Sequence, residues 1–297
     1  MAAQRSHSEY RPDIDGLRAV AVLAVVAFHA FPDWIQGGFI GVDVFFVISG
    51  YLISTIIFAS LDEGTFSFSE FYFRRIQRIF PALILVLVAC FAFGWFALLA
   101  DERKELGKHI AAGAGFLSNL VYLNEAGYFS DAEYTKPLLH LWSLGIEEQF
   151  YIFFPIFMWF SWKRKFNLLL VVFIVTSISF ILNIYGLEDN GVAAFYSPQT
   201  RIWELLSGSL LVWAIRCKNI FYHDGNLRIY VKAVSNVMSF SGLFLLVYGF
   251  FGINKDLGFP GVWALVPVLG AVLIILAGTE AWVNRLILSN NIAVWFG

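Results

Sequence analysis

GFIGVDVFFVISGYLISTIIFASL, residues 38–61, is a run of apolar residues that contains one ionisable side chain, Asp43. A helix needs about 20 mostly apolar residues to cross the hydrocarbon core of a bilayer, so this run predicts a membrane span. The whole chain agrees, because 59% of its residues are hydrophobic and 14% are charged, where a soluble domain has about 25% charged residues. We therefore predict an integral membrane protein.

Seven further segments are long and apolar enough to be spans: 17–33, 79–99, 145–162, 167–187, 201–216, 233–253 and 259–279. The expected fold is an all-α, polytopic transmembrane helix bundle with about eight spans. Because the chain shows neither a long Pro/Ser-rich linker nor a repeat, we expect one membrane domain over residues 1–297.

A ninth stretch, 109–126, is ambiguous because it contains two glycines, a serine and two asparagines. Basic residues concentrate in cytoplasmic loops, and this rule tests whether the stretch crosses. If it does not cross, most basic groups fall on one side of the membrane: Arg5, Arg11, Arg18, Arg74, Arg75, Arg78, Lys163, Arg164, Lys165, Arg216, Lys218, Arg228, Lys232 and Arg285. We therefore expect a cytoplasmic N-terminus and an outer segment, 100–144, that is partly re-entrant.

Composition also argues against several kinds of partner. The net charge is -2, and the basic residues form short groups rather than one face, so nucleic acid is not an expected partner. Cys90 and Cys217 are far apart and fit neither a disulfide framework nor a metal site, and we expect no metal. Membrane lipid is the expected surrounding.

Ionisable groups inside spans are costly, so each one is a functional hypothesis. Arg18 and His29 are eleven residues apart, which places them on nearly the same helix face about 16 Å apart. A histidine there can take a proton from a hydroxyl group, or it can be structural. Asp43 can orient or charge-stabilise His29, as a carboxylate does in a catalytic triad, or it can cap the second span near its outer end.

A third polar group opens a later span, in the sequence Pro137-Leu-Leu-His-Leu-Trp-Ser-Leu-Gly-Ile-Glu-Glu-Gln-Phe-Tyr151. Glu147 and Tyr151 are four residues apart and share a helix face, whereas Glu148 points about 100° away. One glutamate at a helix N-terminus is ordinary, because the helix dipole favours it. Two glutamates followed by Gln149, with His140 upstream, indicate a polar site.

Arg74, Arg75 and Arg78 lie just before a span on the expected cytoplasmic side. Such a group anchors a helix to anionic headgroups, and it can also clamp a phosphorylated donor, because guanidinium groups bind phosphate through paired hydrogen bonds. Arg201 and Glu204 are three residues apart and can neutralise each other, so we assign this pair no function.

The sequence resembles the acyltransferase-3 family of bacterial membrane O-acyltransferases. The resemblance runs from about Tyr10 to the chain's end, and it rests on stretches that occur in register: 10–19, the Arg18-to-His29 spacing, 38–51, 73–81 and 140–151. The family implies a membrane domain of ten helices that carries acetyl groups from cytoplasmic acetyl-CoA to sugar hydroxyls outside.

The resemblance also implies roles for individual residues. His29 matches the family's essential histidine, which handles the acetyl group or activates the acceptor, and Arg18 matches its paired arginine. The arginines of residues 74–78 match those expected to contact the CoA phosphates. Glu147, Gln149 and Tyr151 match the family's acidic motif, in which serine often stands where this chain has Gly145. His140 and Asp43 lie within the matching stretches.

Two departures from the family pattern concern the end of the chain. Residues 288–297 begin a new apolar run and stop, so we expect a chain cut before the last family helices. The hydrolase-like domain that many relatives carry after those helices is not present in the sequence.

The favoured hypothesis is a multi-pass acetyltransferase of the bacterial cytoplasmic (inner) membrane, with acetyl-CoA as donor and an extracytoplasmic glycan as acceptor. Lipopolysaccharide, peptidoglycan and exopolysaccharide all fit the residues present. The main alternative is a polar-solute or proton-coupled transporter that uses His29, Asp43 and Glu147. A membrane scaffold is the third reading. The acceptor, the acyl chain length, a covalent acetyl-histidine and the oligomeric state stay open at this stage.

Overall fold

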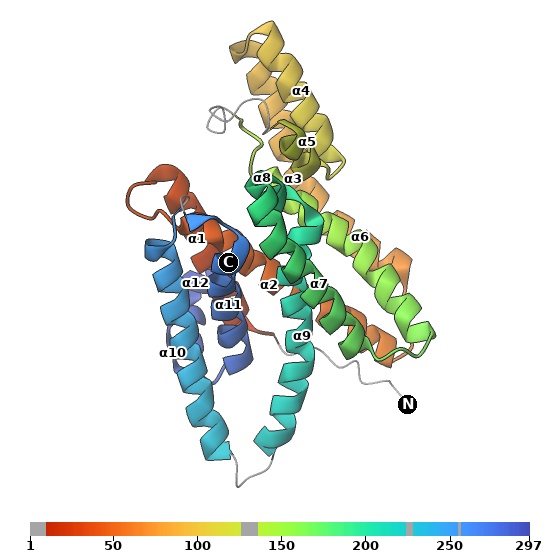
Figure 1. The fold of residues 1–297 in the computed structure, drawn as a ribbon, viewed down its shortest axis with the longest axis vertical. Helices are drawn as coiled ribbons and strands as arrows, with labels where there is room; N and C mark the ends of the chain where they lie inside the picture. The colour runs from red at the N-terminus through yellow and green to blue at the C-terminus, as the bar shows by residue number, and fades with distance from the viewer. Residues whose placement is uncertain (1–9, 126–135, 224–227, 255–256) are drawn as a thin grey trace. The chain divides into compact units, whose positions relative to one another are not determined.

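The structure, a computed structural model, describes residues 10–125, 136–223, 228–254 and 257–297. Within these ranges every regular element is helical, which confirms the all-α prediction (Figure 1). The α-helices are α1 (Pro12–Ala30), α2 (Gly41–Asp62), α3 (Phe68–Ala97), α4 (Ala100–Ala114), α5 (Ser118–Glu125), α6 (Leu141–Lys163), α7 (Leu168–Asp189), α8 (Gly191–Tyr196), α9 (Pro198–His223), α10 (Arg228–Gly252), α11 (Leu265–Ala277) and α12 (Asn291–Phe296).

Three short helices complete the fold. Two are 3-10 helices, η1 (Gly38–Ile40) and η4 (Gly261–Ala264), and the third, η5 (Asn284–Leu288), is a π-helix. Several helices begin where an asparagine or serine accepts a backbone hydrogen bond. Asn167 caps α7 and Asn190 caps α8, since each side chain accepts from the backbone N–H three residues on, at 3.2 and 3.1 Å.

The chain forms two compact units. Unit 1 comprises residues 1–48, 211–257 and 263–297, and unit 2 comprises 49–210 and 258–262. The boundary between them falls inside α2 and α9, so each of these helices contributes residues to both units.

Unit 1 is built on α10 and α11, which pack side by side (Figure 1). Their backbones approach closely at a glycine pair, because a Cβ added to Gly242 would lie 2.7 Å from the Gly270 carbonyl oxygen. Small residues allow such close approach of membrane helices. Helix α1 packs on α12, η5 and η1.

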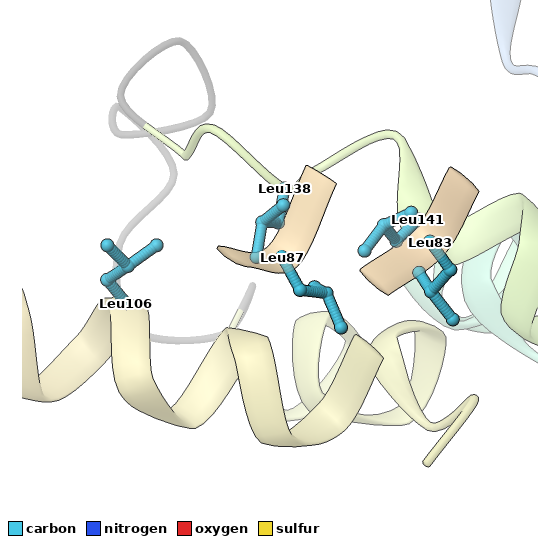
Figure 2. Close-up of a cluster of buried hydrophobic side chains, with 5 residues drawn as sticks. All are labelled: Leu83, Leu87, Leu106, Leu138 and Leu141. Carbon is cyan, nitrogen blue, oxygen red and sulfur yellow. The ribbon is translucent and has the colours of Figure 1, made fainter. Parts of the chain in front are cut away.

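Unit 2 holds a cluster of five buried leucines (Figure 2). Leu83 and Leu87 come from α3, Leu106 from α4, Leu138 from the turn before α6, and Leu141 from the first position of α6. Burying a leucine side chain stabilises a fold by roughly 1.5–3 kcal/mol, so this cluster fixes where α6 begins. The polar residues 147–151 follow within two turns.

In the part of the chain that the structure describes, four helices are long and apolar enough to cross a membrane: 38–62, 68–97, 168–189 and 229–252. Helix α11, with the preceding η4, is apolar but shorter. Other predicted spans coincide with helices that carry charged residues, such as Asp13, Asp15 and Arg18 in α1. The chain is therefore a helical protein with candidate membrane spans, and the predicted count of eight spans is not confirmed.

The ambiguous stretch 109–126 does not form one helix. Helix α4 ends at Ala114 after 15 residues, and α5 has 8 residues. Between them Phe116 has a φ of +56°, an unusual conformation for a residue other than glycine, and it turns the chain. Because neither helix approaches 20 residues, this finding supports the prediction that the stretch does not cross the membrane.

Candidate functional site

His29 lies in the last turn of α1, and its side chain is exposed. Its Nδ1 is 2.8 Å from the Val25 carbonyl oxygen, and the ring packs edge-on against Phe28. A carbonyl oxygen only accepts hydrogen bonds, so we assign the proton of the neutral ring to Nδ1. The Nε2 lone pair is then available to accept a proton, as a general base requires.

Arg18 and Asp43 belong to the same unit as His29. Arg18 lies three turns before His29 on α1, and its Nη1 pairs with Asp15 Oδ1 at 3.5 Å. Asp43 is fully buried in the first turn of α2, where the helix dipole favours a carboxylate. In this conformation the Val25 carbonyl, rather than Asp43, orients the His29 ring.

The three arginines of α3 differ in exposure. Arg74 forms an ion pair with Glu70, one turn earlier on the same helix, and its side chain is 63% exposed. Arg78 is also exposed, whereas Arg75 is half-buried. Arg75 interacts electrostatically with the carboxylate of Glu148. The structure thus places one arginine toward α6 and leaves two on the surface.

Glu147 and Tyr151 meet as their spacing predicts. Tyr151 Oη donates a hydrogen bond to Glu147 Oε2 at 3.3 Å. Glu148 is 7% exposed, and among the described residues its Oε1 has no hydrogen-bond partner. These three residues of α6 and Arg75 of α3 belong to unit 2.

The side chain of Gln149 on α6 forms hydrogen bonds with the turn between α4 and α5 and with the start of α5. Its Nε2 donates to the Phe116 carbonyl at 2.8 Å and to Asn119 Oδ1 at 3.0 Å, and Asn119 donates to the Tyr196 carbonyl at 3.1 Å. A Cβ added at Gly145 would lie 2.9 Å from Asn119 Oδ1, so glycine fits here without a shift of Asn119. The amide nitrogen of Gln149 is thus engaged within the protein.

His140 sits at the N-cap position of α6 and is exposed. Its carbonyl oxygen accepts a hydrogen bond from Ser143 Oγ at 3.3 Å. This position leaves the imidazole at the start of the helix that carries Glu147, where a solute can reach it.

The structure also shows a buried ion pair to which the sequence assigned no function. Arg201 and Glu204 are both fully buried, with Arg201 Nε 3.2 Å from Glu204 Oε1. The Arg201 guanidinium lies 5.5–5.8 Å from the ring centroids of Trp142, Phe195 and Phe259. Such cation–π contacts stabilise a desolvated cation. The i, i+3 spacing signals the ion pair, but nothing in the sequence signals which rings surround it.

Comparisons with known proteins bear on the family of the chain. A family model described as an acyltransferase domain matches residues 11–297. The chain is 33% identical to a Staphylococcus aureus protein named "Putative O-acetyltransferase", over 97% of this chain and 48% of that protein. It is 32% identical to the peptidoglycan O-acetyltransferase OatA of Listeria monocytogenes, over 99% of this chain and 48% of that protein.

A third relative, an uncharacterized protein of Haemophilus influenzae, is 33% identical over 78% of this chain and 96% of its own length. The chain therefore spans about half the length of the two named O-acetyltransferases. The comparison with solved structures gives no match.

Proposed function

The chain belongs to the acyltransferase-3 family, and from this premise we propose that it is a membrane O-acyltransferase. The proposed reaction moves an acetyl group from cytoplasmic acetyl-CoA to a hydroxyl group of an extracytoplasmic glycan. The observation that carries the proposal is the geometry of His29, whose Nδ1 is held by Val25 so that Nε2 is available as a base. The names of the relatives support the reaction class.

The chemistry needs one proton acceptor and two positioned substrates. His29 Nε2 takes the proton of the acceptor hydroxyl, and the oxygen attacks the thioester carbonyl carbon. A carbon–oxygen bond forms, the carbon–sulfur bond breaks, and the CoA thiolate leaves and takes a proton. Because the thioester is already activated, positioning of the two substrates and stabilisation of the oxyanion account for much of the rate enhancement.

The donor side is assigned to arginines. Arg74 and Arg78 are exposed on one face of α3, where they are available to the phosphates of acetyl-CoA. Arg75 interacts electrostatically with Glu148, and we assign it a second role, which is to hold α3 against α6. Arg18 is assigned to the donor as well, because it lies on the same helix as His29.

The acceptor side is assigned to the start of α6. Glu147 is held by Tyr151 and is placed to accept a hydroxyl hydrogen bond, with His140 and Gln149 nearby on the same helix. Peptidoglycan is the first acceptor to test, because one relative is named for it. Lipopolysaccharide and exopolysaccharide follow. We place the enzyme in the bacterial inner membrane with a cytoplasmic N-terminus.

The test is transfer of labelled acetyl groups from acetyl-CoA to cell-envelope glycan in membranes that contain the full-length protein. Replacing His29→Ala should lower transfer by about 10²- to 10⁴-fold, the contribution of a general base. Val26→Ala, an exposed change on the same helix, is the matched control. Equal transfer by wild type and His29→Ala would contradict the mechanism. If no protein transfers while all insert equally, the transporter reading takes precedence.

A further inference from the structure

The C-terminal end of α11 is closed by side chains from distant parts of unit 1. A helix leaves its last four carbonyl groups without partners inside the helix, here those of residues 274–277. The Asn284 side chain donates to the Ile274 carbonyl at 2.8 Å, and Arg11 donates to the Ile275 carbonyl at 3.0 Å. Lys218 donates to the Leu276 and Ala277 carbonyls at 2.8 and 2.5 Å. Two of the three donors are cations, which the negative end of the helix dipole favours.

Two of these donors, Arg11 and Asn284, also form hydrogen bonds with Asp13 in the first turn of α1. Arg11 donates to both carboxylate oxygens of Asp13, at 2.8 and 2.7 Å, and Asn284 Nδ2 donates to Asp13 Oδ2 at 2.8 Å. Ser239 of α10 in turn donates to Asn284 Oδ1 at 2.7 Å. Asp13 and Asn284 are 1% and 0% exposed, and a satisfied buried network of this kind fixes one arrangement.

The backbones beside this network are in direct contact. A Cβ added at Gly16, one turn after Asp13, would lie 1.9 Å from the Leu288 carbonyl oxygen at the end of η5. About two turns further along α1, a Cβ at Gly38 of η1 would lie 2.3 Å from the Ala24 carbonyl oxygen. Helix α1 thus meets η5 and η1 at two close backbone contacts, which leave it little room to slide.

We propose that Asn284 is a positioning residue that sets the axial register of α1, and with it the places of Arg18 and His29. The inference rests on the proposed acetyl transfer. A slip of one residue along α1 moves a side chain by about 1.5 Å and turns it by about 100°. A displacement of about 1 Å caused by a distant change can cost about a hundredfold in rate. The amide is required because it donates to Asp13 and accepts from Ser239 at the same time.

The test compares wild type with Asn284→Asp, which places a second carboxylate beside that of Asp13 in a buried site. Transfer should fall by between about tenfold and a hundredfold. The double variant Asp13→Asn with Asn284→Asp restores one amide and one carboxylate, and it should recover part of the loss. Recovery is partial because position 284 then has no donor for the Ile274 carbonyl and position 13 has no charge for Arg11. Ser239→Ala is a milder variant that removes one hydrogen bond and should lower transfer a few-fold.

The matched control is Asn236→Asp on α10, whose side chain only accepts from the Trp282 backbone N–H at 3.0 Å, so a carboxylate serves equally well. A second readout does not depend on activity. Hydrogen exchange of the α1 backbone amides should be faster in Asn284→Asp than in wild type, and the double variant should restore it in part.

The outcomes separate the two proposals. If wild type transfers no acetyl, the proposed function fails, while the exchange data still show whether Asn284 holds α1. If wild type is active and Asn284→Asp matches it in both transfer and exchange, the positioning role is wrong. A loss of transfer with unchanged exchange in α1, or a loss that the double variant does not recover even in part, also overturns it.

Discussion

The two units hold their polar residues in different ways. In unit 1 the reactive candidate, His29, is exposed and makes a single hydrogen bond, while the network that supports its helix lies at the opposite end, around Asp13 and Asn284. In unit 2 the candidate residues Glu147, Glu148 and Tyr151 lie among the side chains that join α2, α3 and α6.

This difference predicts how function and stability separate. An exposed side chain with few contacts changes stability little when it is replaced, usually within about 0.5 kcal/mol. A buried polar side chain costs much more to remove, because its partner is left without a hydrogen bond in a dry environment. Replacing the exposed His29 of unit 1 should therefore lower activity alone, and replacing a buried polar residue of unit 2 should lower both activity and stability.

The largest effect should come from breaking the buried pair of unit 2. Replacing Arg201→Met leaves Glu204 as a buried carboxylate without its cation, which should cost about 3–5 kcal/mol of stability. Unfolding of the purified protein in detergent measures this cost. The double variant Arg201→Met with Glu204→Leu should recover most of it, because apolar residues often replace a buried pair at little cost.

Arg103 offers a matched control. Its guanidinium also lies over an aromatic ring, that of Trp95 at 5.6 Å, but the side chain is exposed. Arg103→Met should cost about 1 kcal/mol or less. If Arg201→Met cost no more than Arg103→Met, burial would not decide what an arginine of unit 2 contributes to stability.

The second prediction separates the neighbouring glutamates. Glu147→Gln should lower kcat about a hundredfold, because it weakens the side chain proposed to hold the acceptor. Glu148→Gln removes the carboxyl group that interacts electrostatically with Arg75 and should raise the KM for acetyl-CoA about tenfold, through a less well-placed α3. Steady-state kinetics with varied acetyl-CoA measure both. Identical changes in kcat and KM would mean that the two carboxylates share one role.

Some contacts of the structure could be predicted from the sequence, and they are contacts within one helix or one short stretch. Spacing within one helix predicted the Glu147–Tyr151 contact and the separation of Glu148, because the helical period fixes both. The glycines and asparagines of 109–126 predicted that it is no ordinary span, and the break at Phe116 agrees. Local patterns were sufficient in these cases.

Contacts between distant segments were beyond the sequence. Asp13 and Asn284 are 271 positions apart, and nothing in either neighbourhood marks the other as its partner. Sequence reasoning grouped Arg75 with Arg74 and Arg78 as one clamp, and the electrostatic interaction of Arg75 with Glu148 of α6 could not be predicted from that group. One chain shows which residues share a helix face, but the packing of other helices decides what that face meets.

A third prediction uses two glycines in unlike surroundings. Gly16→Ala places a methyl group against the Leu288 carbonyl, and it should destabilise unit 1 by about 1–3 kcal/mol through overpacking. Gly107→Ala, in the middle of α4 in unit 2, meets nothing within 4 Å and should stabilise by about 0.5–1 kcal/mol. Unfolding in detergent measures both. If Gly16→Ala were neutral, α1 would have more freedom to move than the positioning role of Asn284 allows.

The smallest effect concerns pH and the α4–α5 hairpin of unit 2. Burial raises the pKa of the Glu125 carboxyl, but hydrogen bonds from Lys108, Lys136 and His109 outweigh burial and lower the pKa from 4.5 to about 2. Because the folded pKa is below the unfolded one, the stabilisation is fully present above about pH 4.5 and is lost as the pH falls toward about 2.

Unfolding temperatures measured between about pH 6 and pH 3 should therefore fall more steeply for wild type than for Glu125→Gln, which carries no titrating group at this position. Glu105→Gln, an exposed change on α4, should keep the wild-type slope. Equal slopes for all three proteins would mean that the contacts of Glu125 with its two lysines add no net stability. The apolar contacts of Leu83, Leu87 and Leu106 would then contribute more to the stability of the hairpin than the ion pairs of Glu125 do.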